Sequence, residues 1–468
     1  MNKMTNLTNL RSFKPGRQHW LLSFLLAAWA LPLSYFTLYY SRSDFWHLIL
    51  FFALSILAYY IFLVYSRIAA IGESLGIAAG ILLRLFLVFL PPVLSEDVYR
   101  FLWDGFLDIH FLSPYASLPQ ELKVSSFSSA ESTIATELLE RMNSHRFYSV
   151  YPPILQIFFS ASAWSMKEFQ SIWVGIVVWK GILFCFELGA LRLFLTFRTE
   201  GENTNFLKYW LHPLVVLEGA GSGHPEPILI FFLLLAILAW KRNRRIEAGL
   251  AYIAAVLVKV IPLLSLPFIL LRIWKGRRQY SGRIISVVIL VIPVLLIYAW
   301  GMHSINLAET IEKQWKNGIG VYFKLFEYHG GLYYLWKYIL SYSWYPYSAG
   351  LHLAALGSAV LLAYSFLQSR QIPDVEFVAK TWVSLLGIYY LFSSTIHPWY
   401  ILPLLAGTVF TKQIWPQVAS AVWILSYSTY RRTPYADDPI FMILEYAPVL
   451  IVFFWEKRKL IDLKKDKI

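Results

Sequence analysis

The sequence predicts an all-α polytopic membrane protein. Of its 468 residues, 58% are hydrophobic and only 15% are charged, whereas a soluble domain carries roughly a quarter charged residues. Apolar runs of about 20 residues, the length that crosses a hydrocarbon core as a helix, recur along the chain. The alternating pattern of outer-membrane barrel strands is absent. Helices must therefore satisfy the backbone in lipid, and we expect a bundle of roughly 10–13 transmembrane or re-entrant helices.

The position of each run sets the expected domain organisation. The clearest apolar runs are residues 20–40, 45–65, 76–94, 228–240, 284–300, 351–367 and 377–396. We expect three transmembrane helices in residues 1–94, an external catalytic loop with an interfacial helix in 95–151, a transmembrane core with broken helices in 152–400, and C-terminal helices with a basic cytoplasmic tail in 401–468. Within the core, residues 301–330 are expected to form a second external loop.

Two apolar stretches of the core do not fit simple crossings. Residues 154–163 are about half the length of a span, so they predict a re-entrant or interfacial piece. Residues 248–271 are interrupted by Lys259 and Pro262 and have basic flanks at both ends, which favours a broken helical hairpin.

Basic residues indicate the orientation and the partner. The net charge is +13, and the lysines and arginines cluster near the N-terminus and at residues 198–208, 241–245, 275–283 and 456–467. Such clusters at the ends of apolar runs are typical of cytoplasmic loops. The expected partner is therefore a lipid bilayer and not nucleic acid. We predict a multi-pass protein of the plasma (inner) membrane, with residues 95–151, 301–330 and 397–399 on the non-cytoplasmic side.

The stretch that follows the third apolar run carries the most polar pattern. If residues 96–110 are helical, Asp97, Arg100, Asp104 and Asp108 lie on one face and aromatic residues lie on the other. We expect this helix to lie flat at the interface, with its acidic face toward water. Arg100 could simply pair with its two neighbouring aspartates. Asp97, at the end of a span, is in a position where carboxylates are usually functional.

One exposed aspartate and several cations suit one class of reaction. Glycoside hydrolysis calls for two carboxylates, because a sugar alkoxide leaves poorly without a proton. Transfer from a sugar phosphate needs only a base for the acceptor hydroxyl and cationic groups for the departing phosphate.

Six motifs occur in a fixed order: SEDVYRFLWDG with the following SPY, then Tyr151-Pro152-Pro153, LEGAGSGH ending at His224, Lys259-Val260-Ile261-Pro262 and His397-Pro398-Trp399-Tyr400. In these motifs the chain resembles bacterial GT-C glycosyltransferases that use polyprenyl-phosphate mannose, and more distantly the catalytic subunit of GPI mannosyltransferase I. The resemblance implies a GT-C-type bundle and a hexosyltransferase that transfers mannose, with inversion, to a lipid-linked or cell-envelope acceptor at the outer face. It also implies Asp97 as general base, with Glu96 as the adjacent fallback.

Further candidates are assigned by the same motifs and by position. Lys259, far from either basic flank, is expected to face the donor phosphate, although snorkelling is the alternative. The candidates for binding the donor phosphate or sugar are Arg100, Lys259, His397, Trp399 and Tyr400. The candidates for the acceptor or for shaping the loops are Asp104, Tyr151, His224, Glu226 and His329. The element around His224 departs from the family pattern, because Ser222 and Glu226 replace an expected Asn and Asp.

No cofactor is expected. His224 and Glu226 stand two residues apart without a third ligand at recognisable spacing, so nothing indicates a metal, and a divalent ion remains an open alternative. The competing hypothesis is a transporter or flippase for a lipid-linked saccharide, suggested by the broken helix around Pro262 and the intramembrane Lys259.

Overall fold

The computed structural model describes residues 15–66, 71–202, 205–275, 307–321, 326–342 and 348–465. Across these residues the protein is an all-α bundle, and its only β pairing consists of isolated bridges of Tyr328 and His329 with Thr395. The predicted run at 284–300 lies outside the described residues. So do the N-terminal basic residues 3–14 and most of the basic cluster at 275–283.

Six described helices are long and apolar enough to cross a membrane. They are α2 (Pro15–Tyr39), α3 (Phe45–Tyr65), α8 (Ile172–Thr199), α18 (Ala349–Gln368), α19 (Val375–Phe392) and α22 (Pro439–Lys465). A seventh crossing is formed if the bent pair Pro213–Gly221 and Glu226–Lys241, which meet at 112°, is one broken span. The protein is thus a polytopic membrane protein, while the total of 10–13 helices stays a prediction.

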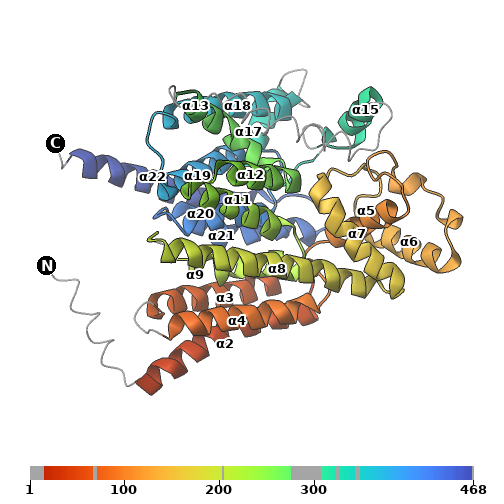
Figure 1. Cartoon of the computed structure of the whole chain (residues 1–468), viewed down its shortest axis with the longest axis horizontal. Coiled ribbons are helices and arrows are strands. Elements are labelled where there is room, and N and C mark those ends of the chain that lie inside the picture. The colour runs from red at the N-terminus through yellow and green to blue at the C-terminus, as the bar shows by residue number, and fades with distance from the viewer. Residues whose placement is uncertain are drawn as a thin grey trace.

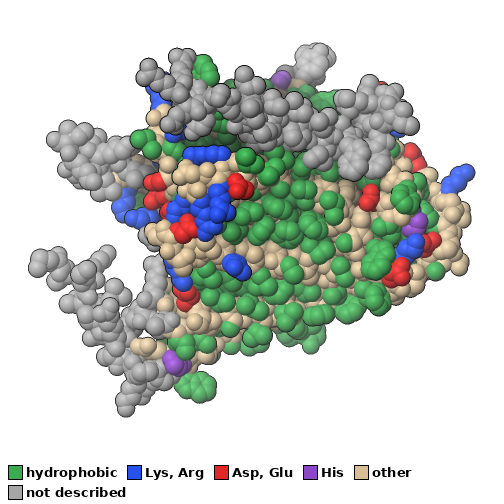
Figure 2. Space-filling view, viewed as in Figure 1, with side chains coloured by type: hydrophobic (Ala, Val, Ile, Leu, Met, Phe, Trp, Pro, Cys, Tyr) green, Lys and Arg blue, Asp and Glu red, His purple; other side chains and the backbone are tan. Residues whose placement is uncertain are grey.

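These long helices run side by side (Figure 1). The chain begins α2 and ends α22 at the left of the figure, and α5 (Asp97–Ile109), α6 (Ser129–Arg141) and α7 (Pro153–Glu168) lie at the right. We call residues 95–168 the cap. Figure 2 shows hydrophobic side chains over the middle of the visible face, with charged side chains gathered toward its two ends.

The third predicted run is shorter in the structure than in the sequence. Helix α4 (Gly72–Val88) ends six residues before the run does, because Pro91 and Pro92 cannot continue it. The chain after it is held by α8: Lys180 Nζ donates hydrogen bonds to the carbonyl oxygens of Leu87 and Leu90 at 2.6 and 2.7 Å. The segment leading to Asp97 is therefore tied to the bundle.

Local sequence features explain how helices α6 and α7 form in the cap. A capping box between Ser128 and Glu131 starts α6, and Ile134 and Leu138 of this helix are buried against the rest of the cap. The short apolar run at 154–163 forms part of α7, which packs on α5 and α8.

The remaining elements complete the bundle around the site. They are α9 (Leu207–Trp210), α10 (Pro213–Val216), η4 (Leu217–Gly221), α11 (Glu226–Lys241), α12 (Arg245–Val258), η5 (Ile261–Ser265), α13 (Leu266–Lys275), α15 (Leu307–Asn317), α17 (Gly331–Ser341), η7 (Pro398–Ile401), α20 (Leu402–Thr408), α21 (Trp415–Val422) and η8 (Trp423–Arg431); the short turns η2 (Pro119–Glu121) and η3 (Val124–Ser126) belong to the cap.

The helix around Lys259 is broken in the structure. Helix α12 ends at Val258, Lys259 is extended, and α13 follows η5 and ends at Lys275. That the two parts form a hairpin stays a prediction. The Arg272 guanidinium donates to the carbonyl oxygens of Ser369 and Gln371, beyond the end of α18.

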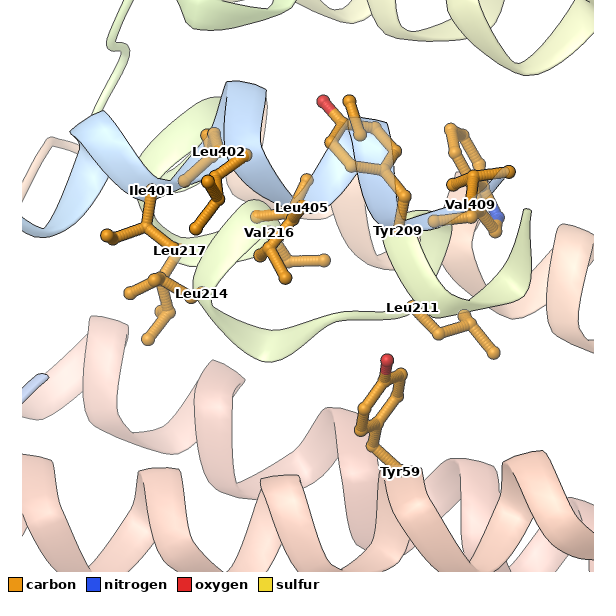
Figure 3. Packing of buried hydrophobic residues seen from close by; sticks show 14 of the residues in the cluster. Tyr59, Tyr209, Leu211, Leu214, Val216, Leu217, Ile401, Leu402, Leu405 and Val409 are labelled. Atoms are coloured by element: carbon orange, nitrogen blue, oxygen red, sulfur yellow. The ribbon is translucent and has the colours of Figure 1, made fainter. Parts of the chain in front are cut away.

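The deepest packing joins two stretches that are almost 200 residues apart. Tyr209, Leu211, Leu214, Val216 and Leu217 pack with side chains of η7 and α20, and Tyr59 of α3 lies beside them (Figure 3). The labelled partners from η7, α20 and the residue after it are Ile401, Leu402, Leu405 and Val409. This core fixes the chain around His224 against the chain around His397.

Candidate functional site

A cavity of about 1810 Å³ lies where the cap meets the bundle. Ligand pockets commonly hold 300–1,000 Å³, so this cavity has room for more than one substrate group. Eight of the residues singled out from the sequence line it: Asp97, Arg100, Tyr151, His224, Lys259, His397, Trp399 and Tyr400. Glu96, Asp104, Glu226 and His329 are not among its lining residues.

Asp97 is the first residue of α5 and reaches the cavity with 23% of its side chain exposed. Its backbone N–H donates to Ser95 Oγ at 3.2 Å. Burial, with a further contribution from the neighbouring Glu96 carboxylate, raises the pKa of Asp97 to about 6. A carboxylate with this pKa is ionised at neutral pH and still basic enough to accept a proton.

Glu96 has a different environment from its neighbour. Its carboxylate pairs with the Arg42 guanidinium and lies 3.4 Å from Asn143 Nδ2. Arg42, from the turn between α2 and α3, also lies over the Tyr430 ring at 4.1 Å and lines the cavity. Sequence reasoning missed Arg42, although a basic residue at the predicted outer end of the first two spans is a departure from the usual charge distribution.

His224 lies behind Asp97 and is almost completely buried. Its Nδ1 is 4.0 Å from Asp97 Oδ2, and its Nε2 is 3.5 Å from Glu218 Oε2. The backbone that places it is unusual: residues 217–221 form a π-helical turn, and Gly223 has a φ of +82°. Such π-turns are frequent at functional sites. Glu218 was not identified from the sequence.

A stack of four rings forms one wall of the site. Trp399 lies between His224 and His397, with ring centroids at 3.7 and 4.3 Å and interplanar angles of 12° and 3°. His397 in turn meets Tyr328 at 4.4 Å. Both faces of Trp399 are therefore covered, and only its edge can meet a sugar. Burial, aided by the charge of Lys259, lowers the pKa of His397 to about 3, so its ring is neutral.

Lys259 occupies the break between α12 and η5. Its ammonium pairs with the buried carboxylate of Glu226, at the start of α11, and lies 4.2 Å from the centre of the Tyr400 ring. One quarter of the Lys259 side chain is exposed. The structure therefore holds this cation at the cavity wall instead of leaving it free in lipid.

The prediction that α5 turns an acidic face toward water is wrong. Asp104 is fully buried, and Arg100 is 97% buried, because the loop at residues 144–149 and α7 cover that face. Arg100 Nε donates to Asp104 at 2.7 Å, and its Nη1 donates to the carbonyl oxygens of Ser144 and Phe147. Ser149 Oγ donates to Asp104 at 2.5 Å. These two residues brace the loop, and α5 meets the cavity through Asp97, Arg100 and Phe101.

His329 and Tyr151 have separate surroundings. His329 does not line the cavity but is buried directly behind it, in a network with Glu445 at 2.6 Å and with the lining residue Thr429 at 3.0 Å. Tyr151 lines the cavity and packs edge-on against Phe101 of α5. In the part of the chain that the structure describes, no group of three or more His, Cys, Asp or Glu side chains could hold a metal ion.

The sequence was compared with known families once this geometry was defined. The family whose model matches is the MptA_B family, alpha-(1->6)-mannopyranosyltransferase, N-terminal domain, over residues 41–275. This stretch is half of the chain, and it carries Asp97, Glu218, His224 and Lys259. The chain belongs to this family. Comparisons with curated proteins and with solved structures gave no match.

Membership of the MptA_B family agrees with the expected resemblance at the level of mannosyltransferases. The protein is thus a multi-pass membrane glycosyltransferase of a mannosyltransferase family. The part of the site contributed by residues 397–400 lies beyond the matched stretch.

Proposed function

We propose that the protein transfers mannose from a polyprenyl-phosphate donor to a lipid-linked or cell-envelope acceptor, with Asp97 as general base. The observation that carries the proposal is that one cavity is lined by the Asp97 carboxylate and by the cations Arg42 and Lys259. The remaining assignments, including the GT-C type of the fold and the donor-binding role of His397, rest on the resemblance and on this arrangement.

The two cations support the departure of a phosphate. A phosphodiester donor gains a second negative charge when the sugar leaves, so fixed positive groups stabilise the transition state more than the ground state. Glu96 and Glu226 each hold one of the cations in place from outside the cavity lining. The two cations therefore need to move little during the reaction.

The carboxylates of the cavity support a single displacement with inversion. Asp97, Glu327 and Asp437 are the carboxylates among the described lining residues. Glu327 is engaged by Lys337 and Tyr333, and Asp437 by Thr429 and Tyr334. Asp97 is left as the base, and among the described lining residues no second carboxylate is available as a nucleophile. Since one displacement inverts the anomeric carbon, an alpha-linked product, as the family description states, requires a beta-linked donor phosphate.

The charge distribution supports a reaction on the non-cytoplasmic side. Lys241 and Arg242 lie with Glu200 at the end of the bundle opposite the cap. If that end is cytoplasmic, as basic loops usually are, then the cap and Asp97 face the outside of the cell.

Transfer with purified full-length protein in detergent tests the proposal. The two donors are beta-linked polyprenyl-phosphate mannose and a nucleotide-activated mannose, each radiolabelled, with a membrane glycolipid extract as acceptor. We expect alpha-linked labelled product, and one polyprenyl phosphate released per mannose, from the lipid donor alone. Transfer only from the nucleotide donor would contradict the proposal. Movement of labelled lipid across proteoliposomes without covalent change would instead favour a flippase.

A further inference from the structure

Glu218 and His224 carry two buried polar atoms that face each other. Glu218 is fully buried, and His224 is 99% buried. Glu218 Oε2 and His224 Nε2 have no hydrogen-bond partner, yet they lie only 3.5 Å apart. An unsatisfied buried polar atom costs about 1–3 kcal/mol, so a pair of them beside a cavity calls for a functional explanation.

The same two residues connect the protein interior with the cavity. Tyr427 Oη donates to Glu218 Oε1 at 2.8 Å, and His224 Nδ1 lies 4.0 Å from Asp97 Oδ2. The series Tyr427, Glu218, His224 and Asp97 therefore runs from the core to the cavity wall. The 3.5 and 4.0 Å separations exceed normal hydrogen bonds, as is common before substrates bind and catalytic contacts shorten.

The histidine ring is held so that its two nitrogens point in opposite directions. Trp399 stacks on it at 3.7 Å. The backbone oxygen of the preceding Gly223 accepts a hydrogen bond from Trp179 Nε1 at 2.7 Å. His224 therefore cannot rotate freely, and each nitrogen faces one carboxylate.

We propose that Glu218 and His224 form a proton relay that acts through Asp97. The relay requires Glu218 and Asp97 to be ionised before transfer, with His224 neutral and its proton on Nε2, directed at Glu218. Asp97 takes the proton of the acceptor hydroxyl as the oxygen attacks the anomeric carbon and the sugar–phosphate bond breaks. Asp97 then passes this proton to His224 Nδ1, while the Nε2 proton moves to Glu218. One proton enters the relay, Glu218 ends neutral, and Asp97 is ionised again.

The charges around His224 suit such a transfer. The pairs of Arg42 with Glu96 and of Lys259 with Glu226 are each compensated, and the nearby His397 is neutral. Moving a proton from Asp97 to Glu218 therefore leaves the total charge of the site unchanged while the leaving phosphate gains its second charge.

The inference rests on the proposed function, so its test begins with transfer by the wild-type protein. The variants are His224→Gln, which keeps hydrogen-bonding atoms but cannot carry a proton, and Glu218→Gln. The control is His212→Gln, because His212 is equally buried but does not line the cavity. For each protein, kcat, donor KM, Tm and the solvent isotope effect in mixtures of H₂O and D₂O are measured.

We expect a curved dependence of kcat on the D₂O fraction in the wild type, because more than one proton moves. His224→Gln and Glu218→Gln should lower kcat at least tenfold, change donor KM less than twofold and make the dependence linear. His212→Gln should keep the curvature whatever its Tm. A linear wild-type dependence, curvature retained in either relay variant, or kcat within twofold of wild type would overturn the relay. Absence of transfer by the wild type would overturn the proposed function, and the relay with it.

Discussion

At the scale of single residues, the surroundings of each carboxylate separate its role from that of its neighbours. Glu96 is held by Arg42, Asp104 by Arg100 and Ser149, and Asp108 Oδ2 accepts from Ser160 Oγ at 2.5 Å. Asp97 is part of the same stretch, yet it faces the cavity with a raised pKa. Its position at the cavity therefore supports the proposal that Asp97, and not Glu96, Asp104 or Asp108, is the base.

The pH dependence of transfer follows from the raised pKa of Asp97. The base must be ionised, so kcat/KM should fall about tenfold per pH unit below pH 6 and level off above it. Burial disfavours the ionised form, so the stability associated with a protonated Asp97 is lost as pH rises through about 6. Rates measured between pH 4.5 and 8.5 check the first point. An acid limb centred near pH 4 would show that burial does not tune this group.

The paired cation gives a second prediction. Lys259→Met should raise the donor KM at least tenfold, because a phosphate ligand is lost, and it should lower Tm, because Glu226 is left buried without its partner. The double variant Lys259→Met/Glu226→Gln should recover Tm but not donor affinity. Thermal unfolding and donor titration separate the two effects. Recovery of affinity in the double variant would exclude Lys259 as a phosphate ligand.

Local patterns in the sequence indicate some of these residues but not their contacts. Asp97 and Lys259 stand out because charged groups at the ends or within apolar runs are costly. Arg42 and Glu96 are 54 residues apart, and the ring stack combines His224 with Trp399 and His397. Such contacts depend on how spans pack, which no local periodicity encodes. The contacts of Glu218 with Tyr427 and His224 likewise could not be predicted from the sequence.

At the scale of elements, α5 depends on close packing against α7. A Cβ at Gly105 would collide with the backbone carbonyl of Phe159. This glycine is therefore needed for close approach of the two helices, and the approach sets where the N-terminus of α5, with Asp97, meets the cavity.

Substitution of this glycine tests the contact. Gly105→Ala should destabilise the protein by about 1–3 kcal/mol, as overpacking typically does, and should reduce transfer. The matched change Gly181→Ala in α8 meets no atom within 4 Å and should be neutral or slightly stabilising, because alanine favours helices. Measurements of Tm and activity for both variants test whether α5 and α7 are in close contact at Gly105. Equal Tm values would show that α5 and α7 are not tightly packed at this point.

The sequence predicted most of the long apolar helices well, but it missed α8 and the environment of α5. Hydropathy located α2, α3, α18 and α19 closely, because a span of about 20 apolar residues has few alternatives in lipid. Helix α8 was not among the runs singled out, since Lys180 and Glu187 interrupt its apolar sequence. Both have partners on α4 or just after it: Lys180 donates to the carbonyl oxygens of Leu87 and Leu90, and Glu187 pairs with Arg84. The face of α5 was misjudged because a helix covered on all sides can carry a buried ion pair.

At the scale of the whole molecule, the bundle separates a polar end with basic loops from a capped end with the cavity. In the described part of the chain, six helices long and apolar enough to cross a membrane and one bent pair lie between them. Under the proposed function, we expect the lipid-linked donor to reach Asp97 from the bilayer and the acceptor hydroxyl to approach from the side of the cap.

Labelling of single cysteines tests the orientation of the bundle. In a background with Cys185→Ser, the change Phe111→Cys places a thiol in the cap, where the side chain is 97% exposed. Asn243→Cys places one in the turn between α11 and α12. An impermeant maleimide should label position 111 in intact spheroplasts and position 243 only after permeabilisation. The opposite pattern would place the cap in the cytoplasm.

The most direct test of the account is turnover of Asp97→Asn compared with Asp108→Asn in purified protein supplied with polyprenyl-phosphate mannose. Both changes remove one carboxylate from α5, but only Asp97 lines the cavity. Loss of a general base lowers rates by about 10²–10⁴-fold, so Asp97→Asn should lose at least a hundredfold in kcat with an unchanged or higher Tm, whereas Asp108→Asn should stay within threefold. Turnover of Asp97→Asn equal to that of Asp108→Asn would contradict the claim that Asp97 is the base.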